Sequence, residues 1–151
     1  MTILDDLKAD HRHLKAEIRA ILKFDDREER VARFSQFRTL LTAHSRAEEN
    51  VLYGGLEKFE KGKDEALEGT VEHEVADRLV EDLSASRNFE ADKWTARCTV
   101  LKELLEHHIE EEEDEMFKTA RKQFDKKALD EMGKEFKKEK VKYGMPATDA
   151  K

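Results

Sequence analysis

Four histidines of this sequence stand in regular apolar patterns at positions where leucine or valine would be expected. They are His11, His44, His73 and His108. Two of them are followed four residues later by a glutamate, His44 by Glu48 and His108 by Glu112. Side chains four residues apart lie on the same face of a helix, so each pair would point into one volume. Imidazole and carboxylate groups together are ligands of first-row transition metals, so the pattern indicates metal chemistry.

A single histidine in such a pattern is most often a residue at the edge of the core that is hydrogen-bonded to a carbonyl group. Here one histidine occurs in each of four apolar stretches, and two carboxylates accompany them. A buried carboxylate without a cation or a donor is energetically expensive. A metal ion would offset this cost for all six groups together, so the combination favours a metal centre over four unrelated core histidines.

The second and fourth of these stretches read as an internal repeat. Residues 44–53 and 108–117 share the pattern H-x-x-x-E-E-x-x-x followed by an aromatic residue. The repeat favours His108 over the neighbouring His107 as the candidate ligand, because only His108 keeps the Glu-Glu pair and the aromatic residue in register. We therefore expect His107, like His13 elsewhere in the chain, at the surface or just outside the ligand set.

The elements that must position these residues are helices, because the apolar residues recur at steps of three and four. In the second stretch, for example, the pattern runs from Val31 through Phe34 and Phe37. Thr2 with Asp5 is typical of a helix start, as is Asp26 with Glu29. Helices are predicted at about 3–23, 27–53, 64–86, 90–121 and 126–141, with a break that includes Gly54, Gly55 and Gly62.

Four amphipathic helices with short connections bury their apolar faces most simply as a bundle. We therefore predict an all-α fold, an antiparallel up-down four-helix bundle over residues 1–122. Residues 118–142 hold ten basic and five acidic side chains. A short basic helix and tail at 123–151 is expected to pack on the bundle.

The composition excludes several classes of protein. The length of 151 residues fits one domain, and the net charge of −7 disfavours nucleic acid as a partner. No apolar run reaches the roughly 18–20 residues of a membrane span, and the N-terminus is not a signal peptide, so a cytoplasmic location is expected. The single Cys98 excludes an intrachain disulfide and a cysteine-based zinc site.

Taken together, the motifs resemble those of the hemerythrin family, specifically its bacterial HHE cation-binding branch, over roughly residues 3–121. The matching motifs are Asp10-His11, the His44/Glu48 pair, Glu72-His73-Glu74 and the His108/Glu112 pair. The resemblance implies a four-helix bundle around two non-heme iron ions joined by an oxo or hydroxo bridge. It also implies that the four histidines are terminal ligands of the ions and that Glu48 and Glu112 bridge them.

Two departures separate this sequence from the oxygen-carrying hemerythrins that it resembles. Those proteins have a further histidine one turn after that of the third helix, where this chain has Asp77. They also end the fourth-helix motif with aspartate, where this chain has Glu112. The missing histidine implies one more open position at the metal centre, and Asp77, Glu49 and Tyr53 are the candidates to fill it.

Three classes of function are compatible with these motifs. The first is a di-iron protein that binds or reacts with a small oxidant (O2, peroxide or nitric oxide), with peroxidase-like, catalase-like or oxidase activity as options. The second is an iron- or oxygen-sensing or metal-storage module without catalysis. The third is a structural bundle that holds zinc or another divalent ion. The oligomeric state stays open at this stage, with a monomer among the options.

Overall fold

The computed structural model describes residues 1–147, and within that range the chain forms helices and no strand. The elements are α1 (Ile3–Lys23), α2 (Arg27–Glu48), η1 (Glu49–Tyr53), α3 (Gly54–Leu56), α4 (Glu60–Ala85), α5 (Asp92–Glu111), η2 (Glu112–Met116), α6 (Phe117–Gln123) and α7 (Lys126–Lys142). The all-α class predicted from the sequence is thereby confirmed. The end of the predicted C-terminal tail, residues 148–151, lies outside the described residues.

The starts of the first two helices are fixed by the side chains that the sequence suggested. Thr2 and Asp5 form a reciprocal capping box, in which the Thr2 backbone N–H donates to the Asp5 carboxylate over 3.0 Å. The Asp26 carboxylate accepts from the backbone N–H of Glu29, also at 3.0 Å. Such caps satisfy backbone donors that have no partner within the helix and stabilise it by about 1 kcal/mol. They therefore set the register in which α1 and α2 present their buried faces.

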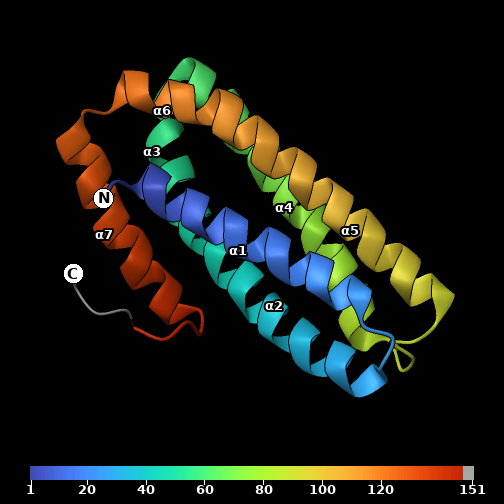
Figure 1. Ribbon diagram of the computed structural model, residues 1–151. Coiled ribbons are helices and arrows are strands. Elements are labelled where there is room, and N and C mark those ends of the chain that lie inside the picture. Colours follow the sequence, from blue (N-terminus) through green and yellow to red (C-terminus); the bar gives the residue numbers. More distant parts are fainter. Residues whose placement is uncertain (148–151) are drawn as a thin grey trace.

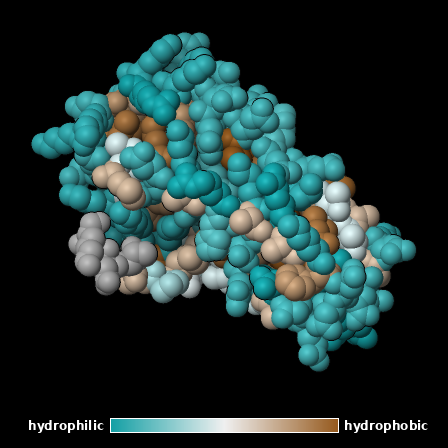
Figure 2. Space-filling model, viewed as in Figure 1, coloured by the Kyte–Doolittle hydropathy of each residue, from teal (hydrophilic) through white to brown (hydrophobic). Residues whose placement is uncertain are grey.

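Helices α1, α2, α4 and α5 lie side by side (Figure 1). Helix α2 continues through η1 and α3, and α5 continues through η2 and α6. After a turn at Phe124 and Asp125, α7 packs against α1 and α2. No helix among the described residues is long and apolar enough to cross a membrane. Much of the face seen in Figure 2 is hydrophilic.

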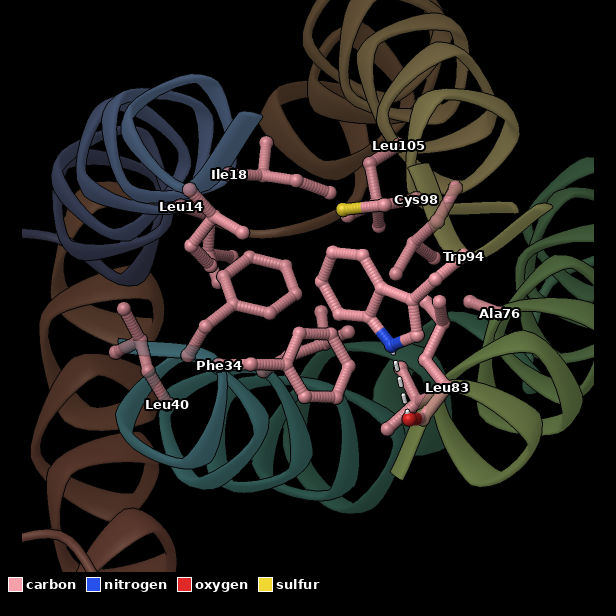
Figure 3. Packing of buried hydrophobic residues seen from close by; sticks show 14 of the residues in the cluster. Leu14, Ile18, Phe34, Leu40, Ala76, Leu83, Trp94, Cys98 and Leu105 are labelled. Carbon is pink, nitrogen blue, oxygen red and sulfur yellow. Dashed lines mark hydrogen bonds between the residues drawn. The ribbon is translucent and has the colours of Figure 1, made fainter. Parts of the chain in front are cut away.

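Two separate apolar clusters fill the interior. One surrounds Trp94, whose indole N–H donates to the carbonyl of Leu83 over 3.1 Å (Figure 3). The other includes Tyr53, Phe117 and Phe136 at the end where α7 packs. Along each of the four long helices, the histidine falls between residues of the first cluster and residues of the second. In α1, for example, His11 lies between Leu7 and Leu14. The histidines therefore form a polar layer between two apolar ones.

The predicted break at the glycine-rich segment is confirmed in position but is shorter than predicted. The chain stays helical through Gly54 and Gly55 and turns only at residues 57–59, and α4 begins at Glu60 rather than at 64. The turn brings the two segments so close together that a Cβ atom on Gly62 would lie 2.4 Å from the carbonyl oxygen of Leu56. Only a residue without a side chain permits this close approach.

The predicted apolar pattern also fails at one position of α2. Val31 is 37% exposed, whereas its neighbour Arg30 is 3% exposed. The Arg30 guanidinium donates to the backbone carbonyls of Phe24 and Phe89 and so closes the end of the bundle where two connections meet. Arginine is tolerated there because its buried donors are paired.

Candidate metal centre

The structure brings together all six side chains that the sequence singled out as ligands. They are His11, His44, Glu48, His73, His108 and Glu112, and none is more than 5% exposed. Each of the four long helices contributes one histidine, and α2 and η2 contribute the glutamates. These groups form the layer between the two apolar clusters.

The six side chains fall into two groups that share a carboxylate. His11, His44 and Glu48 each offer a ligand atom, and these atoms lie within 4.8 Å of one another. Glu48, His73 and His108 form a second group by the same measure. One oxygen of Glu48 lies 3.3 Å from Nε2 of His73 and 3.9 Å from Nε2 of His44. Glu48 therefore stands between the two groups.

Glu112 spans the two groups in the same way. Its Oε1 lies 3.2 Å from Nε2 of His11, and its Oε2 lies 3.2 Å from Nε2 of His108. A carboxylate that faces one histidine of each group with different oxygens has the arrangement of a bridging ligand. The two groups are compatible with the binding of metal ions.

Several polar atoms of this layer are buried without a hydrogen-bond partner. They are Nε2 of His11, Nε2 of His108, both carboxylate oxygens of Glu48 and Oε1 of Glu112. An unpaired buried polar group costs about 1–3 kcal/mol, and a charged one costs more. Imidazole nitrogens and carboxylate oxygens that converge without pairing fit the donor set of a divalent transition metal. The residues present therefore suit a metal centre.

Behind the centre, every one of the four histidines is held by a second carboxylate through its other ring nitrogen. The Nδ1 atoms pair with carboxylate oxygens as follows: His11 with Glu113 at 2.7 Å, His44 with Asp10 at 2.9 Å, His73 with Glu49 at 2.6 Å, and His108 with Glu72 at 2.7 Å. We call these four acids the outer carboxylates. Each one lies on a different helix from the histidine that it holds, so the four hydrogen bonds run once around the bundle.

The outer carboxylates fix the chemical form of the imidazoles. An ionised carboxylate accepts a hydrogen bond from Nδ1–H, so in the neutral imidazole the proton stays on Nδ1 and Nε2 is the nitrogen with a free lone pair. Nε2 is the nitrogen that faces Glu48 or Glu112 in each ring. The sequence contained a signal for this arrangement, since an acid directly adjoins His11, His73, Glu48 and Glu112. Only the fold shows which histidine each acid reaches.

Two of the three candidates for a further ligand are engaged elsewhere. Asp77 lies 3.0 Å from a guanidinium nitrogen of Arg46, in an ion pair. Glu49 pairs both with His73 and with Arg46. The remaining candidate is Tyr53, which is 1% exposed. Its hydroxyl donates to Oε2 of Glu112 over 2.8 Å, inside the layer of histidines.

Tyr53 reaches this position by way of a π-helical turn. In both repeats the helix widens into a π turn where the H-x-x-x-E motif ends: η1 begins just after Glu48, and η2 begins at Glu112. Such turns are frequent at functional sites. The aromatic residue of each repeat, Tyr53 at the end of η1 and Phe117 just after η2, stacks on a histidine of the opposite half, Tyr53 on His73 and Phe117 on His11.

The C-terminal helix also contacts the centre. Nζ of Lys140 lies 2.9 Å and 3.0 Å from the two carboxylate oxygens of Asp10, the outer carboxylate of His44. The ring of Phe136 meets the ring of His44 edge to face, with the centroids 5.9 Å apart. Helix α7 thus touches the environment of one histidine directly.

Without a metal ion, the electrostatics of the layer favour a proton on some of these groups and disfavour it on others. Burial opposes the charged form of His11, but the carboxylates of Glu112 and Glu113 outweigh it and raise its pKa to about 9. Burial lowers the pKa of His44 to about 4. Burial and the charge of Glu112 raise the pKa of Glu48, so this carboxyl holds a proton more readily than an exposed one. A metal ion that binds here would displace these protons.

The two remaining histidines lie at the surface, as the sequence indicated. The side chain of His13 is 59% exposed and lies 3.8 Å from Glu17. The side chain of His107 is 65% exposed and lies 3.3 Å from Glu111. Neither belongs to the two buried groups.

Comparison with known proteins gives one family match and one similar relative. The profile of the family described as "Hemerythrin HHE cation binding domain" matches residues 2–120. A protein from Nostoc sp. named "DNA nickase" is 28% identical to this chain over 142 residues. That alignment covers 94% of this chain but 40% of the relative, so the chain spans well under half of that protein. No solved structure gives a significant match.

Proposed function

The chain belongs to the hemerythrin HHE cation-binding family, and we therefore propose that the buried layer holds two iron ions that bind or react with a small oxidant. The observation that carries the proposal is the convergence of unpaired buried ligand atoms in two groups, spanned by Glu48 and Glu112. His11 and His44 would hold one ion, and His73 and His108 the other. O2, peroxide and nitric oxide are the oxidants that such a centre admits.

Bound iron would supply one-electron chemistry and coordination positions open to a small ligand. The residues of this chain supply the rest. Two apolar clusters on either side of the layer exclude bulk water. The outer carboxylates hold the Nδ1 protons of the histidines in place, so the Nε2 lone pairs keep a fixed direction. The Tyr53 hydroxyl keeps one proton within reach of Glu112.

We propose that Tyr53 occupies one of the remaining metal positions, because its hydroxyl is the polar group already directed at Glu112. Burial and the charges of Glu112 and Glu48 raise the pKa of Tyr53 in the absence of metal. A cation in the layer would reverse this effect and favour the phenolate. Tyr53→Phe is then expected to abolish the visible phenolate-to-iron absorption band of the ferric protein while metal content stays near normal. Persistence of the same band in Tyr53→Phe would place Tyr53 outside the metal shell.

The reactivity prediction follows from the difference in ligands. Asp77 is paired to Arg46, and Tyr53 would supply an oxygen ligand, so the proposed centre lacks the further histidine that oxygen carriers have. We expect the diferrous protein to be oxidised by O2 without a long-lived reversible complex, and the diferric protein to consume peroxide or bind azide. Anaerobic iron loading followed by separate additions of O2, peroxide and azide, observed by absorption spectroscopy, tests this. Reversible and stable O2 binding without peroxide consumption would instead support oxygen storage or sensing.

A second candidate function is a metal-dependent sensor or storage module without catalysis. The contacts of Lys140 and Phe136 with Asp10 and His44 favour it, because they connect the centre to α7. Iron-dependent protection of α7 from proteolysis, without peroxide turnover, would distinguish it. A zinc-holding structural bundle is distinguished by the absence of colour in the loaded protein.

We do not propose that the chain acts on DNA. The relative named "DNA nickase" is much longer than this chain, and the net charge of −7 is unfavourable for binding a polyanion. A cytoplasmic location likewise stays a prediction from the sequence.

A further inference from the structure

A cavity of about 170 Å³ connects the surface between α4 and α5 with the buried layer. Its inner wall includes His108 and Glu112, which are 5% and 2% exposed. Its outer part is lined by five acidic side chains that are exposed or half-buried: Glu65, Glu68, Glu72, Glu111 and Glu115. Among the described residues, no lysine or arginine lines it. The cavity is therefore an acidic passage that ends at two proposed ligands.

Three side chains at the outer part of this passage form a separate cluster. Glu72, His107 and Glu111 each offer a ligand atom, and these atoms lie within 4.8 Å of one another. Glu72 and Glu111 also line the cavity, and His107 lies 3.3 Å from Glu111. Two carboxylates and one imidazole are a donor set for a divalent transition-metal ion.

The inner end of the passage contains unpaired polar atoms that also support the proposed buried centre. Nε2 of His108 and Oε1 of Glu112 are buried without a hydrogen-bond partner, and both residues line the cavity. Glu72 connects the two ends, because its Oε1 also pairs with Nδ1 of His108 at 2.7 Å. A cation held at Glu72 would therefore be next to the outer face of a proposed ligand.

A second hollow on the surface has a less acidic lining than the passage. It lies between α1 and α5, and its lining combines Lys15 and Arg19 with four acids, Glu106, Glu110, Glu113 and Asp114. None of the six proposed ligands lines it. The two basic side chains offset part of its negative charge, so the acidic passage between α4 and α5, which ends at two proposed ligands, is the better route to the layer.

We propose that Glu72, His107 and Glu111 form an outer loading site for a divalent metal ion, and that the acidic passage delivers the ion to His108 and Glu112. This inference rests on the proposed metal centre for its destination. The outer site raises the local cation concentration and exchanges ligands stepwise, so it accelerates loading without taking part in final binding. It assigns a role to His107, which the ligand set leaves unused.

The test compares metal uptake by the metal-free protein in anaerobic stopped-flow experiments with Co²⁺, whose absorption changes on entering a histidine site. The His107→Ala/Glu111→Gln double variant removes two of the three outer ligands and leaves Glu72 on His108. We expect uptake about tenfold slower at low ionic strength, within the range of electrostatic steering, with the same final metal content. The wild-type rate should fall with added salt more steeply than the rate of the variant.

The matched control is the His13→Ala/Glu17→Gln double variant. It removes a histidine–glutamate pair of the same spacing from α1, and neither residue of that pair lines the acidic passage. We expect its uptake rate to equal that of the wild type. Equal rates in all three proteins, or equal slowing in both variants, would overturn the loading site.

Final metal content separates this inference from the proposed centre. A lower content in His107→Ala/Glu111→Gln would overturn the transient role of the outer site and also the assignment of His108 over His107. If the wild type bound a single ion and the His107→Ala/Glu111→Gln variant bound none, the result would contradict the buried centre and support the outer site. Circular dichroism spectra of both surface variants would show whether they are folded like the wild type.

Discussion

Glu112→Gln is expected to abolish binding of both metal ions, and not to remove one ion of the pair. The reason is the position of this carboxylate, whose two oxygens lie 3.2 Å from Nε2 of His11 and 3.2 Å from Nε2 of His108, in different groups. The amide keeps the side-chain volume but has lost the charge and one acceptor. We expect affinity to fall at least about 100-fold, the upper end of what the loss of an outer-shell partner alone costs. Metal analysis after gel filtration measures the stoichiometry.

Two further variants make the result specific. Glu48→Gln should have the same effect, because Glu48 belongs to both groups. His107→Ala should keep near-normal metal content at equilibrium, since that side chain is exposed and outside the groups. Equal loss of metal in His107→Ala and His108→Ala would contradict the register assigned from the repeat.

The second large effect expected is a strong dependence of fold stability on metal. Without metal the layer contains unpaired polar atoms between two apolar clusters, so binding energy and folding energy are coupled. Each site adds about 2.7 kcal/mol when the free metal concentration is a hundredfold above its Kd. For a domain of this size that corresponds to roughly 5–10 °C in Tm per site. Superimposable melting curves with and without iron would exclude a central site.

The pH dependence differs between the metal-free and the loaded protein. The pKa of His11 is about 9 in the folded metal-free chain and about 6.5 when unfolded. Its contribution to stability is therefore complete below pH 6.5 and is lost as pH rises through 9. The pKa of His44 is about 4, so its contribution is complete above pH 6.5 and is lost as pH falls towards 4. The metal-free protein should be most stable near neutral pH.

The loaded protein should lose stability mainly on the acid side, because protons compete with metal for the imidazoles. Loading at neutral pH should also release protons, since His11 with a pKa of about 9 holds an additional proton in the metal-free chain. Thermal melts across pH, together with an indicator dye in weak buffer during loading, measure both effects. Loading without proton release would contradict the protonation state assigned to the metal-free layer.

The proposed ligands could be identified in the sequence because they violate a periodic pattern, and the fold brings them together. His73, for instance, is identifiable from the apolar residues on either side of it without knowledge of any other helix. The outer carboxylates could not be assigned in this way. Glu49 adjoins Glu48 in the chain, yet it holds His73 of a different helix, and only the packing of α2 against α4 determines that contact.

The departures from the predicted helices have the same origin in tertiary contacts. Nothing in the residues Glu49–Tyr53 forbids an ordinary α-helix, but the π turn brings Tyr53 to Glu112 and His73. Arg30 is buried in place of Val31 because two backbone carbonyl groups from other segments accept hydrogen bonds from its guanidinium group. Periodicity describes what a helix buries on average, whereas these residues respond to partners far away in the sequence.

The four hydrogen bonds between the outer carboxylates and the histidines run once around the bundle and follow an approximate internal twofold symmetry of the chain. Residues 3–56 and residues 60–123 each form a helical hairpin with an acid–histidine pair, an H-x-x-x-E-E motif, a π turn and a terminal aromatic residue. Each hairpin supplies the two histidines of one group, so the chain is built like a homodimer whose subunits have been fused. Departures from that symmetry then identify where the surroundings of the two proposed ions differ. Tyr53 corresponds to Phe117 in this comparison, and among the described residues only Asp10 of the outer carboxylates pairs with a lysine of α7, so the two halves of the centre would be inequivalent.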